Sequence, residues 1–212
     1  FRNLVAQQPL ARAMTNSFVY AISVTIICLF ICSLAGYGFE VYHDKWKDKL
    51  FSILLLAMMI PQVATMIPLF QMFSKAKLLN TTIGFFLPMI STPFMIMMFR
   101  QNARAFPVDI IEAARLDGLT EIGIFFRMFF PTMRSTYAAA AVITFMNAWN
   151  AYLWPKVIMT DGKSLNMVML IANTIGGYKI DYGMIMMGVL FCSIPTMIVF
   201  FVLQKQFAEG IT

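Results

Sequence analysis

The chain has 212 residues, of which 60% are hydrophobic and 12% are charged, and its mean hydropathy is +0.75. This composition is far from that of a soluble domain of the same length, and it leaves no room for a soluble catalytic domain. The net charge of +6 does not indicate nucleic-acid binding, because the basic residues are scattered through loops and form no stripe.

Charge-free runs dominate the chain. A run of 18 or more apolar residues is long enough to cross a hydrocarbon core about 30 Å thick as a helix. Five runs meet this length: Ala13–Phe39, Leu50–Ser74, Leu78–Phe99, Ser135–Pro155 and Tyr182–Gln204. The predicted fold class is therefore all-α, a polytopic transmembrane helix bundle that forms one domain over residues 1–212. The three cysteines lie inside these runs, so we expect packing roles and neither a disulfide framework nor a metal site.

The second run contains prolines and polar residues together. Pro61 and Pro68 flank Gln62 and Thr65, and a proline in a transmembrane helix bends it and frees backbone carbonyls. One interpretation is a kink that serves packing alone. The other interpretation is a bend around a substrate path to which Gln62 and Thr65 contribute polar groups. The residues alone do not decide between the two interpretations.

The loop from Phe106 to Pro131 is the place where acids, bases, small residues and a glycine lie together. Proline suits the first turn of a helix, and glycine accepts the left-handed backbone that ends one. Pro107 and Gly118 therefore predict a short helix from about Pro107 to Asp117, followed by a glycine turn. A second helical segment is expected towards Pro131.

The residues of this short helix allow two interpretations of its role. Ile110, Ile111 and Ala114 can share one face at helical spacing, while Ala113 and Ala114 keep a face slim enough for another protein to approach. The helix could be an amphipathic connector on the membrane surface, or it could be a docking element.

The fourth run ends in an aromatic and amide cluster, Phe145-Met-Asn-Ala-Trp-Asn-Ala-Tyr-Leu-Trp-Pro155. Aromatic rings stack on sugar faces and amides hydrogen-bond to hydroxyls. However, Trp and Tyr near helix ends are also common interfacial anchors, and by physical chemistry alone the anchor interpretation is favoured.

The loop resembles the EAA loop of ABC importer permeases. The resemblance is carried by Glu112-Ala113-Ala114, Asp117-Gly118, Arg127 and Pro131, whose spacing is specific where a lone Glu-Ala-Ala is not. It implies that residues 106–131 form a cytoplasmic coupling helix and loop that dock on an ATPase subunit. The coupling residues that it implies are Glu112, Ala113, Ala114, Asp117 and Gly118.

Further stretches are similar to carbohydrate-uptake permeases of the maltose type, over nearly the whole chain. They are Met-Ile-Pro61, Ile67-Pro68-Leu, Leu79-Asn80-Thr, Asn147-Ala-Trp-Asn150 and Leu153-Trp-Pro155. The type I importer permease fold that this implies usually has six spans with both termini cytoplasmic, so a sixth span is expected before Phe1. A slight excess of basic residues on the side of the 106–131 loop agrees with a cytoplasmic loop.

The resemblance implies a set of partners. They are a second permease subunit in a heterodimer, two ATPase subunits that bind ATP and Mg, and an extracytoplasmic binding protein facing the 156–181 loop. That loop could equally be a surface segment without contact. The expected substrate-path residues are Gln62, Thr65, Asn147, Trp149 and Asn150. No cofactor is expected in this chain, because it lacks the Gly-rich Lys-Ser/Thr loop of P-loop ATPases.

The expected function is therefore that of a bacterial inner-membrane permease subunit that imports a sugar or oligosaccharide. A permease for a glycerol-phosphate ester or a polyol is an alternative, as is a membrane scaffold without transport. An intramembrane enzyme is excluded, because the five runs contain no charged residue from which paired acids or a nucleophile with its base could be built.

Overall fold

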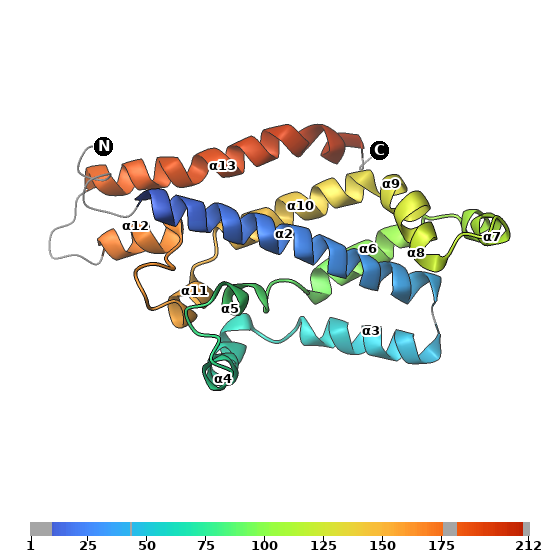
Figure 1. The fold of residues 1–212 in the computed structure, drawn as a ribbon, viewed down its shortest axis with the longest axis horizontal. Coiled ribbons are helices and arrows are strands. Elements are labelled where there is room, and N and C mark those ends of the chain that lie inside the picture. Colours follow the sequence, from blue (N-terminus) through green and yellow to red (C-terminus); the bar gives the residue numbers. More distant parts are fainter. Residues whose placement is uncertain (1–9, 43, 176–181, 210–212) are drawn as a thin grey trace.

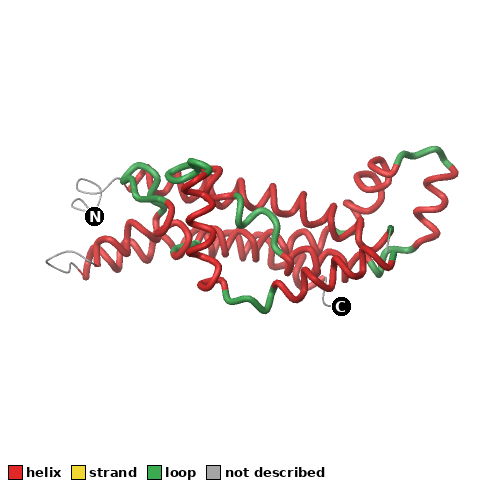
Figure 2. The backbone as a smooth tube through the Cα atoms, turned by 90° about the horizontal axis from the view of Figure 1, so that it is seen from below, coloured by secondary structure: helices red, strands yellow, loops and turns green. Residues whose placement is uncertain are grey.

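The computed structural model describes residues 10–42, 44–175 and 182–209, and these form helices and connecting loops without a strand (Figures 1 and 2). The molecule is elongated, and the long helices run roughly along its longest axis (Figure 1). In chain order they are α2 (Leu10–Val41), α3 (Lys45–Ala57), α4 (Gln62–Lys75), α5 (Thr82–Phe86), α6 (Pro93–Ala103), α7 (Val108–Leu116), α8 (Glu121–Ile124), the π-helix η1 (Phe125–Phe129), α9 (Phe130–Thr132), α10 (Arg134–Trp149), α11 (Leu153–Ile158), α12 (Met167–Ile175) and α13 (Tyr182–Glu209).

Two of the five predicted runs form single long helices. The first lies within α2, and the last lies within α13, whose residues 185–202 are long and apolar enough to span a membrane. Within the described parts of the chain, the number of helices that could span rises from two to three when α3 and α4 are taken as one bent span.

The other three runs are broken. The run 135–155 divides into α10 and α11, and in the other two runs a proline lies at the break. The run 50–74 bends by 104° between α3 and α4, where Pro61 has an extended backbone and precedes the first residue of α4. The run 78–99 divides into α5 and α6, and α6 begins at Pro93 behind a Thr92 cap that accepts from the Met95 N–H. Hydropathy alone does not register such breaks, which is why each run was predicted as one span.

α2 is the central helix and packs against both α6 and α10. At Gly36 the approach to α6 is close, because a Cβ there would lie 2.6 Å from the Cβ of Phe99 and 2.8 Å from the backbone nitrogen of Arg100. α10 and α13 are also in contact, and the indole N–H of Trp149 donates to the carbonyl of Cys192 at 2.9 Å. Small residues at such crossings allow helices to pack closely in a membrane.

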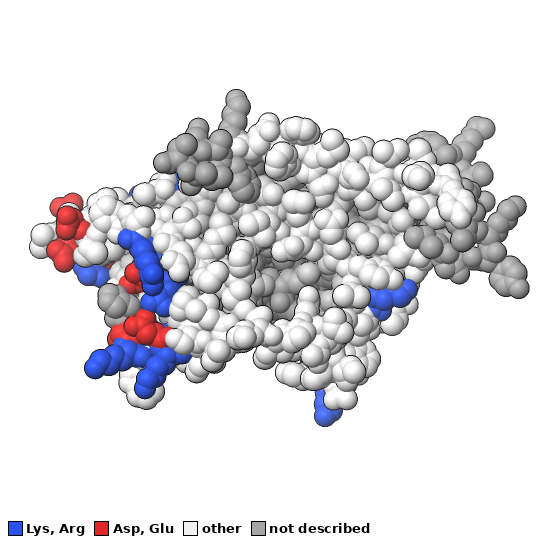
Figure 3. All heavy atoms as spheres, turned by 180° about the vertical axis from the view of Figure 1, so that it is seen from behind, with Lys and Arg blue, Asp and Glu red and all other residues white. Residues whose placement is uncertain are grey.

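The charged side chains in view gather towards one end of the molecule. Figure 3 shows a broad uncharged surface along its length and a mixed cluster of acids and bases near the α7 end, with isolated basic residues elsewhere. This distribution matches a protein whose middle is surrounded by lipid, since buried charge is expensive there.

Candidate functional site: the loop between α6 and α10

The predicted short helix of the loop is present as α7, which projects beyond the bundle (Figure 1). Pro107 stands immediately before it, and Asp117 caps its carboxyl end. Gly118 follows with φ of +79°, the left-handed conformation that the sequence predicted for it. The helix, its limits to within one residue and its glycine turn are thus confirmed.

α7 buries one narrow face and exposes the rest. Ile111 and Ala114 are only 3% and 2% exposed. Ile110, one turn before Ala114, is 39% exposed and so lies at the edge of this face. Glu112 and Ala113 are exposed, and Leu116, one turn further, is 91% exposed. An acid beside uncovered apolar groups is the arrangement that a protein partner can cover.

An apolar cluster beneath α7 attaches the loop to the bundle. We call it the loop cluster, and its buried members are Tyr37, Ala103, Phe106, Ile111, Ala114, Ile124, Phe125, Phe129 and Met133. These residues come from α2, the end of α6, α7, and the segment leading into α10. The ring of Phe129 lies 4.8 Å from that of Tyr37 and 5.6 Å from that of Phe106. The loop therefore rests on three separate parts of the bundle.

The second predicted helical segment of the loop contains a π-helical turn. α8 begins behind Thr120, whose hydroxyl accepts from the Gly123 N–H at 3.2 Å. In η1 the Phe130 N–H donates to the Phe125 carbonyl, a five-residue step that widens the helix just before Pro131. Proline cannot donate to the helical ladder, and a π-turn is a common local adjustment in helices.

Three polar side chains join the loop to the end of α2. Arg115 Nε donates to Glu121 Oε1 at 2.8 Å, and the Tyr42 hydroxyl donates to Glu121 Oε2. The hydrogen bonds from Arg115 and then Tyr42 hold the pKa of Glu121 below its ordinary value. Desolvation, followed by the Glu121 contact, raises the pKa of Tyr42. Tyr42 and Glu121 were not predicted as partners, because their 79-residue separation leaves no local signal in the sequence.

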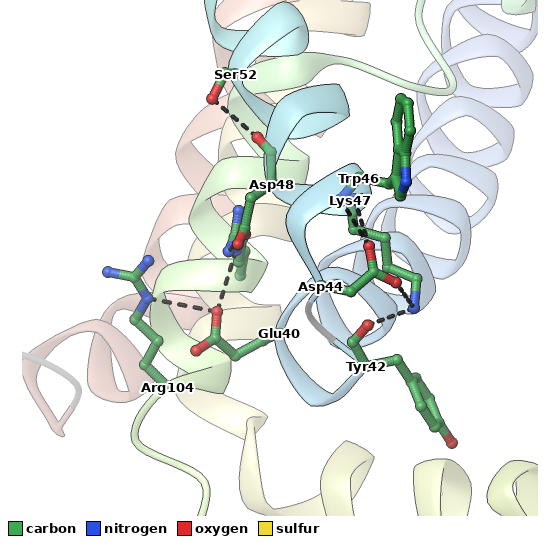
Figure 4. A network of polar contacts seen from close by, with 9 residues as sticks. Glu40, Tyr42, Asp44, Trp46, Lys47, Asp48, Ser52 and Arg104 are labelled. Carbon is green, nitrogen blue, oxygen red and sulfur yellow. Dashed lines mark hydrogen bonds and ion pairs between the residues drawn. The ribbon is translucent and has the colours of Figure 1, made fainter.

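A second polar network stands at the turn between α2 and α3 (Figure 4). Arg100 on α6 is buried, and its guanidinium donates to Glu40 Oε2 at 3.1 Å and to Asp48 Oδ1 at 2.7 Å. Arg104 also donates to Glu40, at 3.4 Å. The guanidinium of Arg100 lies 4.1 Å from the ring centroid of Phe51, within cation–π distance. One arginine thus joins the ends of α2, α3 and α6.

The predicted substrate-path residues divide by exposure. Gln62 and Thr65 are exposed in the first turn of α4, directly after the 104° bend, and the Thr65 hydroxyl donates to the Gln62 carbonyl at 2.8 Å. Asn147 and Asn150 are exposed at the carboxyl end of α10, where the Asn150 amide donates to the Met146 carbonyl at 2.9 Å.

Trp149 differs from the other four residues. It is 1% exposed, its ring stacks on Phe145 at 5.6 Å, and its indole N–H is taken by the backbone of α13. In this conformation its side chain packs between helices and presents no face to a path. The described residues include no group of three or more His, Cys, Asp or Glu that could hold a metal ion.

Loops far from α7 are joined by asparagine side chains. Asn80 has φ of +57° and its Oδ1 accepts from the Thr160 N–H at 2.6 Å. Asn16 on α2 donates to the carbonyls of Lys163 and Leu165, both at 2.9 Å. The predicted contact loop for a binding protein includes residues 176–181, which lie outside the described residues.

Comparison with known proteins identifies the family. The family described as "Binding-protein-dependent transport system inner membrane component" matches residues 29–212. The lactose transport system permease protein LacG of Rhizobium radiobacter is 42% identical over 97% of this chain and 75% of its own length. The arabinooligosaccharides transport system permease protein AraQ of Bacillus subtilis is 34% identical over 93% of this chain and 70% of its own length.

The fold has a counterpart among solved structures. A chain of a bacterial ABC transporter involved in the import of the acidic polysaccharide alginate superposes with a TM-score of 0.81 at 19% identity, covering 92% of this chain and 74% of that one. The sequence and fold comparisons agree with each other and with the apolar helices. The chain therefore belongs to the family of binding-protein-dependent transport system inner membrane components, as a multi-pass permease subunit of the carbohydrate-uptake ABC importers.

Proposed function

We propose that α7 and its flanking loop, residues 106–131, couple this permease to a cytoplasmic ATPase subunit. The observation that carries the proposal is the division of α7 into a buried face of Ile111 and Ala114 and a projecting face of Glu112, Ala113 and Leu116. The buried face ties the helix to the bundle, and the projecting face is available to a partner. A membrane-surface connector would need no such attachment to three parts of the bundle.

The proposed docking core is the set given by the loop motif: Glu112, Ala113, Ala114, Asp117 and Gly118. Of these, Glu112 supplies a charge for a basic residue of the partner, and Ala113 allows close approach. Ala114 acts from beneath by packing into the loop cluster. Gly118 ends the helix in a left-handed conformation. Hydrolysis of ATP, with Mg²⁺, belongs to the partner subunits, and this chain moves in response.

The transport path is proposed to use Gln62, Thr65, Asn147 and Asn150. Their amide and hydroxyl groups are uncharged and exposed, and such groups hydrogen-bond to sugar hydroxyls. Trp149 supports this end of α10 by packing. A second permease chain completes the path, and an external binding protein delivers a sugar or oligosaccharide, as the names of LacG and AraQ suggest for those relatives.

The test is sugar-stimulated ATPase activity of the assembled complex in proteoliposomes. We expect stimulation by the binding protein with one member of a sugar panel that also contains a glycerol-phosphate ester and a polyol. Glu112→Lys should abolish import and stimulation while the chain remains in the membrane. Lys75→Glu, a charge reversal on α4 far from α7 (Figure 1), is the matched control and should import normally.

Each outcome has a defined meaning. Normal import by Glu112→Lys would contradict the coupling role of α7. Stimulation by the glycerol-phosphate ester alone would keep that role and replace the sugar as substrate. Failure of any ATPase subunit to co-purify with the wild-type chain would overturn the proposal as a whole.

A further inference from the structure

The loop contacts the bundle by polar side chains as well as by apolar packing. Glu121 accepts from Arg115 Nε at 2.8 Å and from Arg115 Nη2 at 3.4 Å, so the pair is held by two hydrogen bonds. The Tyr42 hydroxyl donates to the same carboxylate. The Arg115 guanidinium also lies 6.0 Å from the centroid of the Tyr42 ring. We call this set the Tyr42–Glu121–Arg115 brace.

The brace continues into α3 through the backbone of Tyr42. Lys47 Nζ donates to the Tyr42 carbonyl, lies 5.6 Å from the Tyr42 ring centroid, and pairs with Asp44 at 3.4 Å. Asp44 in turn caps α3 by accepting from the Trp46 and Lys47 N–H groups. A series of contacts therefore runs from α7 through the α2–α3 turn to the start of α3. Figure 4 shows the part of this series that joins Tyr42, Lys47 and Asp44.

Apolar packing lies directly beside the brace. The ring of Tyr37 is 6.2 Å from that of Tyr42 and 5.4 Å from that of Phe125, so the loop cluster borders it. Apolar burial is non-directional, so the loop cluster alone does not dictate the angle at which α7 stands. The Arg115 and Glu121 side chains are 43% and 46% exposed, so their pair contributes little to stability. Hydrogen bonds to a carboxylate are nevertheless directional and short, so they can fix that angle.

We propose that the Tyr42–Glu121–Arg115 brace positions α7 against the α2–α3 turn and passes displacement of the coupling loop to α2 and α3. The inference rests on the proposed coupling function and names the positioning residues that this function uses. Tyr42 is the central member, because its hydroxyl meets the loop while its carbonyl meets α3. The three residues touch neither substrate nor nucleotide in this role.

The decisive variant is Tyr42→Phe, which keeps the ring against the loop cluster and removes only the hydroxyl. The quantity measured is sugar imported per ATP hydrolysed in proteoliposomes. We expect this ratio to fall about fivefold, the factor that corresponds to one lost hydrogen bond, while ATP hydrolysis continues. Tyr182→Phe, at an exposed tyrosine that begins α13, is the matched control and should leave the ratio unchanged.

Two further variants separate positioning from general damage. The double variant Tyr42→Phe/Glu121→Ala should be no worse than the poorer single variant, since both substitutions remove the hydrogen bond between the Tyr42 hydroxyl and residue 121. Exchanging the ion pair, by Arg115→Glu with Glu121→Arg, should restore part of the ratio lost in either single reversal. General destabilisation would instead add the single effects and give no rescue.

The outcomes distinguish this inference from the coupling function itself. If Tyr42→Phe imports as many sugars per ATP as the wild type while Glu112→Lys imports none, the brace is overturned and the coupling role stands. If Glu112→Lys imports normally, the coupling role fails and the brace loses its basis. A reduced ratio in Tyr42→Phe without rescue by the exchanged pair would also count against positioning.

Discussion

Gly118 shows at the scale of one residue how conformation and docking can be separated. Its φ of +79° lies in the left-handed region, which residues other than Gly, Asn and Asp rarely adopt. A Cβ at this position would nevertheless meet no atom within 4 Å. The requirement for glycine inside this chain is therefore one of backbone conformation and not of space. Any requirement for the absence of a side chain must come from a partner surface.

Substitutions at Gly118 should therefore affect either stability, through the backbone conformation, or import, through docking. Gly118→Val should lower stability by about 1–2 kcal/mol, the cost of a left-handed residue with a side chain, whereas Gly118→Asn should fold like the wild type. Gly118→Asp should also fold but abolish import, because its side chain would stand in the docking surface. Thermal unfolding and import assays measure the two effects. Gly162→Val, at an open position without a positive φ, is the control.

If Gly118→Asp imports normally, Gly118 is needed only to end α7, and it leaves the proposed docking core. If Gly118→Asn unfolds as readily as Gly118→Val, the strain argument fails.

Glu121 should make the brace insensitive to pH over a wide range. The folded-state pKa of its carboxyl is below the ordinary value of 4.5 because of Arg115, so its stabilising effect is complete above that value and is lost as pH falls through the lower folded pKa. The pKa of Tyr42 is raised from 10.0, so its hydroxyl stays protonated at neutral pH. We expect the wild-type import per ATP to exceed that of Glu121→Gln by a constant factor from pH 5 to pH 9.

A transport series at unit pH steps checks this expectation. The ratio of the two proteins is compared at each pH, so that effects on the other subunits cancel. Convergence of the two curves near pH 6 would mean that the ionised Glu121 carboxylate is not the group that matters.

At the scale of the elements, α2, α3 and α6 depend on one buried arginine. The side chain of Arg100 is 8% exposed and binds two carboxylates, whereas that of Arg104 is 54% exposed and binds one at longer range. Breaking a buried ion pair leaves uncompensated charge, while an exposed pair contributes little. The two arginines, four residues apart on the same side of the molecule, form a natural comparison.

Arg100→Met should therefore lower the free energy of unfolding by about 2 kcal/mol, because hydrogen bonds to two carboxylates are lost, and Arg104→Met by less than about 1 kcal/mol. Thermal unfolding in detergent, followed by far-ultraviolet circular dichroism, measures both. Equal shifts for the two variants would show that burial of Arg100 does not set the strength of this joint.

The elements also show which features local sequence can and cannot predict. α7 was predicted within one residue at each end because Pro107 and Gly118 act locally. The runs 50–74 and 78–99 were each predicted as one span, but Pro61 and Pro93 begin new helices there. Arg100 and Tyr42 escaped prediction because their partners lie 52 to 79 residues away in sequence, and only the packing of the helices brings them together.

At the scale of the whole molecule, α2 connects the polar contacts at the two ends of the bundle. Near its start, Asn16 donates to the 163–165 loop and the Ser17 hydroxyl accepts from the Met167 N–H at 2.8 Å. Just beyond its other end, the Tyr42 hydroxyl donates to Glu121 of the 106–131 loop. A continuous helix of 32 residues is about 48 Å long and resists compression. A displacement of α7 that moves the end of α2 can therefore reach the opposite end of the molecule through α2 itself.

The three tryptophans differ sharply in exposure, which makes the fluorescence of the chain report on one place. Trp46, in the first turn of α3, is 75% exposed, whereas Trp149 and Trp154 are 1% and 4% exposed. A water-soluble quencher such as iodide reaches an exposed indole and not a buried one. Quenchable ultraviolet emission from this subunit consequently originates almost wholly at the α2–α3 turn, at the end of the molecule that we propose for coupling. The native fluorescence thereby acts as a label-free gauge of whether that end is covered by a partner.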